Sequence, residues 1–383
     1  MTSPFVTRLL ADLDTETNPE TRAILLAELG CYWARFGEFA ESERIRQELR
    51  RDFGNARSVR VSIFIMILEG LQLYYKKLSP GARDRMMRAS LLSKSFHERE
   101  LIARTSAWMA HIEMNGARFD SMISELQTSL SALGSGDDIT ECRIALVLGD
   151  ACLISALPPQ SQAWYEVARR AANRLGDHAA VGAMTYNRAA LRVARCRYER
   201  LSTEDLRVDM PLLRLDVESA INYQSVARLR SLEHLLTTTR VGLLMLQEEP
   251  ILAIPLIESL LASDDVPQQS TQRWLLMSDY ARSLAIVGKI DAAQCQLDGV
   301  LASLPVAVPT DDLCLILGSL RDAASLCQRE GQRRDLDSKL RVAVAKHEEI
   351  ASDLRNKLVQ FDPSVFNRSP VQDSSNERRH PMR

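Results

Sequence analysis

Residues 29–42 read LGCYWARFGEFAES, and this stretch shows the local pattern of the fold most clearly. Gly37 and the two residues after it form a turn between two helical segments, because glycine is the commonest residue to end a helix. The first helix places Gly30 against Ser42 of the second, and small side chains at these two positions let the backbones approach closely. The stretch therefore predicts a helix-turn-helix hairpin.

The same register recurs along the whole chain. The first small position falls at intervals of 40, 40, 39, 40, 52, 40 and 43 residues, at Gly30, Gly70, Ala110, Gly149, Ala189, Val241, Ala281 and Ala324. The position twelve residues later is small at Ser42, Ala82, Ser161, Ala253 and Ala293, and large at Met122, Leu201 and Leu336. This alignment favours Gly and Ala at the first position, so the small residues twelve positions later are the independent support. A stacked array of hairpins is therefore predicted.

These hairpins resemble tetratricopeptide repeats, and the likeness is clearest in residues 29–42, 164–177 and 287–293. Residues 171–177 are similar to the linker of the long variant of this repeat, which has about 40 residues. The resemblance covers about 22–346. It implies an all-α fold, an α-solenoid of about eight hairpins, with the first helix of each hairpin lining a concave groove.

The longest interval, between Ala189 and Val241, departs from the array. We interpret residues 201–216 as an enlarged turn, with helix starts at 203–205 and at 209–211. Insertions of this kind often lie on the binding face of a solenoid, and a plain tolerated loop is the other interpretation.

The C-terminal part completes the predicted organisation. Residues 333–360 predict one or two helices that end the stack, so a repeat domain over 1–361 is expected. Residues 362–383 are polar and predict a disordered tail.

Composition and charge restrict the class of protein. The 383 residues are 46% hydrophobic and carry a net charge of -2, so they can bury a core, and no charge excess favours nucleic acid as a partner. No apolar run reaches the roughly 20 residues of a membrane span, and the N-terminus does not resemble a secretory signal. We therefore expect a cytoplasmic protein without a membrane partner. The seven cysteines are scattered singly, as free thiols that pack as small hydrophobic residues.

No catalytic, cofactor or metal site is predicted. The six histidines share no metal-ligand spacing, and the chain has no phosphate-binding loop, dinucleotide fingerprint or nucleophile elbow. We therefore expect a protein that is not an enzyme and needs no cofactor. An enzyme whose residues are spread over distant repeats stays open.

A candidate binding site begins at residues 186–190, YNRAA, which resemble the segment of tetratricopeptide repeats that clamps a peptide's C-terminal carboxylate. In that family the preceding repeat offers a Gly-Asn pair with a lysine one turn earlier. This chain has Gly149-Asp150 and Leu146 there, and an acidic side chain would repel a carboxylate. Asn187 can instead bond a ligand backbone or a neighbouring helix.

The predicted partner-binding residues lie on the first helices of two repeats. They are Tyr186, Asn187, Ala190 and Val193, with Asp150, Cys152 and Ser155 from the preceding repeat. Such small and mixed-polarity groups suit a peptide or a partner helix, and a loop of the same chain is an equal alternative. Arg188 and Arg192 join the set because arginine forks bind carboxylate or phosphate groups. The alternative for these two is a solvated face with local acidic partners.

Two functions follow from this interpretation. The first is a non-catalytic interaction scaffold that binds a peptide or helix of another protein in the groove. The second is the sensory arm of a bacterial signalling or transcription-regulating system that responds to a peptide or small ligand, as in the arrays of peptide-responsive regulators and the maltose-regulon activator that this one resembles. The terminal helix at 333–360 also makes a homodimer possible.

Overall fold

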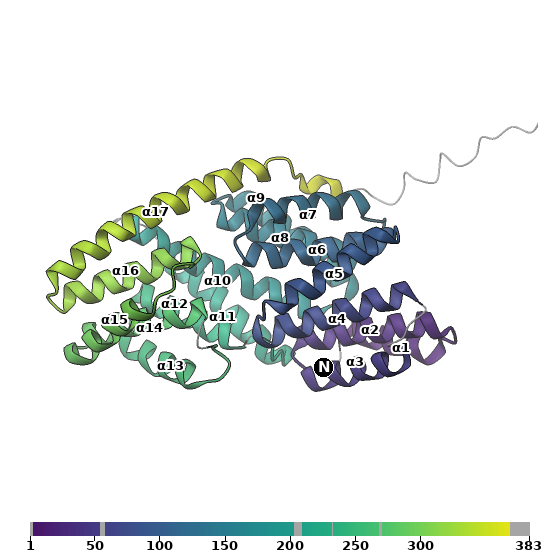
Figure 1. The fold of residues 1–383 in the computed structure, drawn as a ribbon, viewed down its shortest axis with the longest axis horizontal. Helices are drawn as coiled ribbons and strands as arrows, with labels where there is room; N and C mark the ends of the chain where they lie inside the picture. Colours follow the sequence, from purple (N-terminus) through teal and green to yellow (C-terminus); the bar gives the residue numbers. More distant parts are fainter. Residues whose placement is uncertain (1–2, 54–57, 203–208, 232, 268–269, 368–383) are drawn as a thin grey trace, which may run out of the picture.

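The computed structural model describes residues 3–53, 58–202, 209–231, 233–267 and 270–367. These residues contain seventeen α-helices, one 3-10 helix and no β-strand, which confirms the predicted all-α class (Figure 1). The first nine helices are α1 (Pro4–Thr15), α2 (Pro19–Phe36), α3 (Phe39–Phe53), α4 (Val59–Lys77), α5 (Gly81–Ser95), α6 (Arg99–Asn115), α7 (Phe119–Ala132), α8 (Asp138–Ile154) and α9 (Pro158–Leu175). The others are α10 (His178–Ser202), α11 (Met210–Ala227), α12 (Glu233–Gln247), α13 (Pro250–Ala262), α14 (Thr271–Ile286), α15 (Ile290–Ser303), α16 (Thr310–Leu326), α17 (Glu330–Leu358) and η1 (Pro363–Asn367).

The helices pack in adjacent pairs. From α2 onward, each even-numbered helix pairs with the odd-numbered helix that follows it, up to α16 with α17. First helices of neighbouring pairs also contact one another, as α2 does with α4, α6 with α8 and α14 with α16. Local turns set each pair. The turn after α2, for example, is made by Gly37 with a φ of 97°, a conformation that favours glycine.

Small residues hold paired helices close at the predicted positions. The hydroxyl of Ser42 on α3 donates to the carbonyl oxygen of Gly30 on α2 at 2.9 Å, and Ser161 on α9 does the same to Gly149 on α8 at 2.8 Å. A Cβ atom on Gly149 would lie only 3.1 Å from the ring of Tyr165. The spacing of twelve residues thus corresponds to a direct backbone approach within a hairpin.

The interpretation of residues 201–216 as an enlarged turn is corrected at its N-terminal end. Leu201 lies at the end of α10, a continuous helix of 25 residues, and Asp216 lies within α11. Helix α10 continues this far because Leu201 packs on the hydrophobic cluster of α14, α16 and α17. The predicted helix start at 209–211 is confirmed, since the Asp209 side chain accepts from the backbone N–H of Leu212 at 3.0 Å. The start predicted at 203–205 lies outside the described residues.

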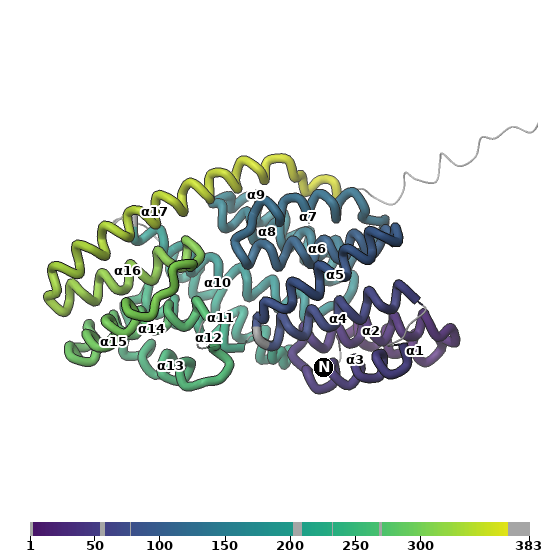
Figure 2. Tube along the Cα trace, viewed as in Figure 1, coloured from purple at the N-terminus to yellow at the C-terminus, as the bar shows by residue number. Residues whose placement is uncertain are grey.

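Helix α10 joins parts of the chain that are far apart in sequence. It contacts α2 near the N-terminus and α16 near the C-terminus (Figure 2). Arg35 of α2 pairs with Asp177, directly before α10, at 2.7 Å. The backbone N–H groups of Arg230 and Ser231 donate to the carbonyl oxygen of Phe36 at 3.0 and 3.3 Å. The segment from α2 to α10 therefore curves until its two ends meet.

The last long helix reaches back to the middle of the chain. Helix α17 packs on α16, and its C-terminal part contacts α7 and α8 (Figure 1). Leu354 and Leu358 are buried there, and Nε of Arg355 donates to the carbonyl oxygen of Ser155 at 3.0 Å. This face of α17 thus packs against other helices of the same chain. A homodimer through the other faces of α17 stays a prediction.

The predicted disordered tail starts too early in the sequence. Residues 363–367 form η1, and the ring of Phe366 packs edge-on against the ring of Trp164 with centroids 5.9 Å apart. This aromatic contact gives the segment apolar surface to bury, so it is ordered. The rest of the predicted tail, 368–383, lies outside the described residues.

Two further features concern the sequence expectations. All seven cysteines are free thiols, and five of them are buried among apolar side chains: Cys31, Cys142, Cys152, Cys314 and Cys327. In the described part of the chain, no helix combines the length and the apolar character that crossing a membrane requires.

Candidate functional site

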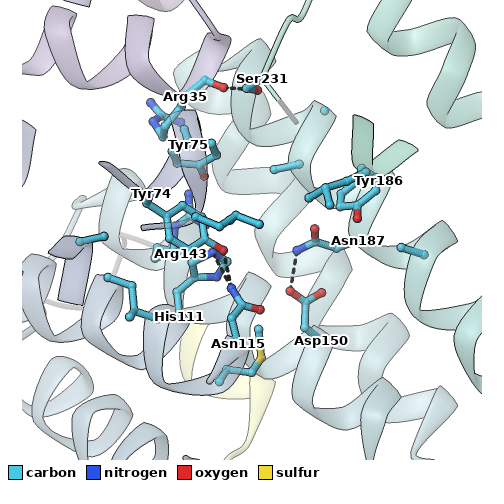
Figure 3. A pocket seen from close by; sticks show the side chains of 18 of the residues that line it. Arg35, Tyr74, Tyr75, His111, Asn115, Arg143, Asp150, Tyr186, Asn187 and Ser231 are labelled. Carbon is cyan, nitrogen blue, oxygen red and sulfur yellow. Dashed lines mark hydrogen bonds between the residues drawn. The ribbon is translucent and has the colours of Figure 1, made fainter. Parts of the chain in front are cut away.

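A cavity of about 520 Å³, here called the central cavity, lies where the first five hairpins curve together. Helices α2, α4, α6, α8, α10 and α11 contribute to its wall. Figure 3 shows polar side chains gathered around it, among them Tyr74 of α4, His111 of α6 and Asn187 of α10. Small-molecule sites in proteins occupy roughly 300–1,000 Å³. The central cavity is therefore large enough to bury a ligand.

The central cavity has a buried floor and an exposed rim. On the floor, Arg143 and Asp150 of α8 are 5% and 1% exposed, and His111 is 5% exposed. On the rim, Leu78 after α4 and Asn115 at the end of α6 are exposed. A ligand that enters past these helix ends reaches charged and polar groups that water barely reaches.

Asp150 is held by two neighbouring helices. The hydroxyl of Tyr165 on α9 donates to Oδ1 at 2.5 Å, and Nδ2 of Asn187 on α10 donates to Oδ2 at 2.7 Å (Figure 3). Burial raises the pKa of Asp150 to about 7, although these two hydrogen bonds and the charge of Arg143 act in the opposite direction. The floor of the central cavity therefore changes its charge near neutral pH.

Arg143 is a buried cation that forms no ion pair and no hydrogen bond with the described residues. Its guanidinium carbon lies 3.6 Å from the centroid of the Trp108 ring, and Nη1 is fully buried without a hydrogen-bond partner. Arg35 and Arg83 also line the cavity, but each of them pairs with a carboxylate at 2.7 Å. Arg143 thus differs from the other arginines of the wall.

Three polar residues lie on the same side of the cavity as Arg143 (Figure 3). Asn115 donates from Nδ2 to the Tyr74 hydroxyl and to Nε2 of His111, the latter at 3.3 Å. Because Nε2 accepts in this arrangement, the proton of the neutral ring is on Nδ1, which is buried without a partner. Burial and the charge of Arg143 lower the pKa of His111 well below its ordinary value. His111 is therefore neutral, and the positive charge here belongs to Arg143.

The structure brings together four of the nine predicted partner-binding residues. Asp150, Tyr186, Asn187 and Ala190 all line the central cavity. Val193 does not, because it is 3% exposed and a Cβ atom on Gly242 of α12 would lie 2.9 Å from its side chain. The prediction failed at this residue because α12 packs directly on this turn of α10.

The two predicted arginines of α10 are occupied by a neighbour within the chain. Nη2 of Arg188 lies 2.6 Å from Oδ1 of Asp216 on α11, and Arg192 pairs with the other oxygen of the same carboxylate. Asp216 itself is buried. The structure thus shows the alternative of a local acidic partner for Arg188 and Arg192.

Arg143, His111, Asn115 and Tyr74 were not among the predicted residues. A signal for Arg143 was present in the sequence. It precedes Asp150 by seven residues, about two helical turns, so the two share one face, and it is the single basic residue of α8. The others come from α4 and α6, and only the curvature of the array brings them to the same cavity.

A second cavity of about 410 Å³ lies between α8, α10, α16 and α17. Burial and the neighbouring Asp311 raise the pKa of Asp312 on its wall to about 8. The ring of His347 packs edge-on against Tyr198 with centroids 4.6 Å apart. Its Arg195 pairs with Glu199 at 2.7 Å, whereas Arg143 has no carboxylate partner among the described residues, so this cavity is the weaker candidate.

No family model matches this chain, and no curated protein matches it. Within the described residues, no group of three or more His, Cys, Asp or Glu side chains is arranged to hold a metal ion. The central cavity is therefore chosen as the candidate site on its geometry and on the polar groups of its floor.

Proposed function

We propose that the chain is a non-catalytic binding protein, an α-solenoid of tetratricopeptide-like hairpins whose central cavity binds a segment of another protein. The observation that carries this proposal is that side chains from the first helices of successive hairpins converge on one cavity with a buried polar floor. In stacked hairpin arrays the inner surface is the usual site for extended partners.

The packing supports a repeat architecture. The pairing of each even-numbered helix from α2 to α16 with its successor repeats the same unit along the chain. Ser42 with Gly30 and Ser161 with Gly149 make the same hydroxyl to carbonyl contact in two different hairpins. A unit that recurs with its contacts is what a tandem-repeat protein requires.

The chemistry of the cavity supports a peptide as the ligand. Asn187 uses Nδ2 for Asp150, which leaves its carbonyl oxygen for a backbone N–H group of a ligand. Ala190 and Leu191 offer apolar wall beside it. Because the cavity is closed on the α2 side by α10, it suits the end of a peptide better than a long segment that passes through.

A second candidate function is a sensory arm that responds to a peptide or small ligand, and the closure of the array favours it. The wall of the central cavity contains residues of α2 and of α10, and these helices meet through long-range polar contacts such as Arg35 with Asp177. A ligand that touches both sides stabilises this arrangement by its binding free energy. Ligand binding would then control the curvature of the array.

Site-specific photo-crosslinking tests the proposed function. A photoreactive amino acid replaces Ala190 on the cavity wall, and in a control protein it replaces Gln162, an exposed residue of α9. Crosslinking is carried out in the cells that produce the protein, and the products are identified by mass spectrometry. We expect a defined partner polypeptide from position 190 and none from position 162. Identical products from both positions, or none from position 190, would contradict the proposal.

The oligomeric state separates the two candidate functions. In the sensory arm, a small ligand or short peptide alone changes the oligomeric state. In the scaffold, a bound partner segment raises the melting temperature by mass action without such a change. Substituting Tyr186 and Asn187 by Ala should weaken binding in both cases.

A further inference from the structure

Burying a charged group without a partner is unfavourable, so an unpaired buried cation requires an explanation. Arg143 is 5% exposed, and its Nη1 lacks any hydrogen-bond partner in the described part of the chain. The nearest acidic group on the same helix, Asp150, is engaged by Tyr165 and Asn187. Among the described residues, Arg143 therefore has no ion pair, and Asp150 acts on it only through its charge at a distance.

The surroundings fix the orientation of Arg143. The Trp108 ring covers one face of the guanidinium at 3.6 Å, a cation-π contact that favours the cation without satisfying its N–H groups. The guanidinium lines the central cavity beside Tyr74, His111 and Asn115 (Figure 3). Its planar fork of N–H donors matches the two oxygens of a carboxylate. Nδ1 of His111 is a further buried donor without a partner.

The charges at the floor of the central cavity favour a ligand group with a single negative charge, because the other surplus positive charge lies at the rim. On the rim, Arg83 and Arg118 share the one carboxylate of Glu113. On the floor, Arg143 is the cation that lacks a counter-ion, and Asp150 lies two turns away on the same helix. One carboxylate balances Arg143, whereas a phosphate dianion would add a negative charge close to Asp150.

We propose that Arg143 binds a carboxylate group of the ligand at the floor of the central cavity. This inference rests on the proposed function and gives the chemistry of the group that enters deepest. The carboxylate comes either from the C-terminus of a peptide or from a free organic acid, and both present the same planar pair of oxygens. Asn187, which resembles the clamp residue of other repeats, serves Asp150 in this chain and does not carry the anion.

Affinity selection with paired peptide libraries tests the proposal. Acetylated tripeptides with a free C-terminal carboxylate compete with the same tripeptides as C-terminal amides for the full-length protein, and retained species are counted by mass spectrometry. We expect the acids to be retained about tenfold more than the amides, or better, because a hydrogen-bonded charge pair is lost in the amide. Equal retention of acids and amides by the wild-type protein would overturn the inference and leave the proposed function standing.

Three variants assign the preference to Arg143. Arg143→Met removes the charge and keeps an unbranched side chain on Trp108, so we expect it to melt no lower than the wild type without ligand and to lose the preference for acids. Arg143→Lys keeps the charge but removes the planar pair of guanidinium N–H donors, so most of the preference for acids should be lost. This variant provides the test if the Met variant does not fold. Arg188→Met is the matched control, because Arg188 serves Asp216, and it should keep the preference. A preference that survives in both Arg143 variants would contradict the proposal.

Free acids distinguish the two sources of the carboxylate. The melting temperature is measured with sodium benzoate and N-acetylphenylalanine, with benzamide and N-acetylphenylalaninamide as neutral counterparts, and with inorganic phosphate. One outcome is that the acids raise the melting temperature of the wild type but not of Arg143→Met, while no peptide is retained. This result supports carboxylate binding by Arg143 and assigns the carboxylate to a small molecule. It removes the peptide from the proposed function. A larger rise in melting temperature with phosphate than with the acids would overturn the assignment of the ligand group as a carboxylate. No shift and no retained peptide would overturn the carboxylate proposal, while photo-crosslinking from position 190 decides the proposed function separately.

Discussion

The hydroxyl of Tyr165 donates a hydrogen bond of 2.5 Å to the carboxylate of Asp150 at the floor of the central cavity. The ring of the same tyrosine also lies against Gly149, where a Cβ atom would come within 3.1 Å. Gly149 is one of the small positions predicted at intervals of about 40 residues, and Asp150 is the next residue. The contact that closes this hairpin therefore also positions the carboxylate of the candidate site.

The pH dependence of stability should report on Asp150. Its pKa is raised from 3.8 to about 7 in the folded chain, so between these values the native state binds more protons than the unfolded state. Its stabilising contribution is full below about pH 4 and is lost as the pH rises toward 7, by at most about 1.4 kcal/mol per pH unit. Asp150→Asn removes this slope, so urea unfolding should show the variant gaining stability relative to the wild type between about pH 4 and about pH 8.

A second variant checks the cause. Tyr165→Phe removes a hydrogen bond that lowers the pKa of Asp150, so the upper end of the window should move to higher pH. Parallel stability profiles for Asp150→Asn and the wild type would show that Asp150 does not titrate in this range.

The small position Ser161 should not tolerate bulk. Ser161→Leu loses the hydrogen bond to Gly149 and forces apart α8 and α9, and we expect it to lower the free energy of unfolding by about 2–4 kcal/mol. Ser161→Ala should cost only about 1 kcal/mol. Gln162→Leu, on the exposed face of the same helix, is the control and should change stability by less than about 0.5 kcal/mol. Similar losses for both Leu variants would mean that close approach at this position is unimportant.

The end of α17 should contribute strongly to stability. Leu354 is 0% exposed among residues of α6 to α9, so Leu354→Ala should lower the free energy of unfolding by about 2–5 kcal/mol. Val342→Ala on the same helix is the control, because Val342 is 69% exposed and should change little. If chemical denaturation gives the same midpoint for both variants, α17 does not dock on the middle of the chain.

The arginines of α10 should matter for stability and not for the ligand. Arg188→Ala with Arg192→Ala leaves the carboxylate of Asp216 buried and unpaired, which should destabilise the protein by about 3 kcal/mol. Adding Asp216→Asn should recover much of this loss. The preference for tripeptides with a free C-terminal carboxylate should be unchanged in the folded triple variant. Loss of that preference would place the two arginines in the binding site after all.

The hairpins could be predicted from the sequence because their determinants are local. Gly37 ends α2, and the small residues at 30 and 42 meet within one hairpin, so spacing along the chain is sufficient to find them. The closure of the array could not be predicted in this way. It depends on contacts such as Arg35 with Asp177, whose residues meet only after the rotation between several hairpins has accumulated.

The candidate-site residues that are placed by regular spacing along the sequence were predicted. Those that the curvature of the packed hairpins brings to the cavity were missed. Tyr186, Asn187 and Asp150 were found because the first helices of two neighbouring hairpins face the same side. Val193 was included by the same rule, but α12 covers it. His111 was missed because no spacing rule relates α6 to α10 across a curved array. Only the three-dimensional structure shows that His111 lines the central cavity.

Filling the central cavity shows whether the ligand binds there. Ala190→Trp places an indole ring in the cavity without changing its charge, and Gln162→Trp on the exposed face of α9 is the matched control. Isothermal titration calorimetry measures the affinity of both variants and of the wild type for one tripeptide. This is the tripeptide with a free C-terminal carboxylate that the wild type retains best. We predict that Ala190→Trp weakens binding about tenfold or more while Gln162→Trp leaves it unchanged. Wild-type affinity in the Ala190→Trp protein would show that the ligand does not bind in the central cavity.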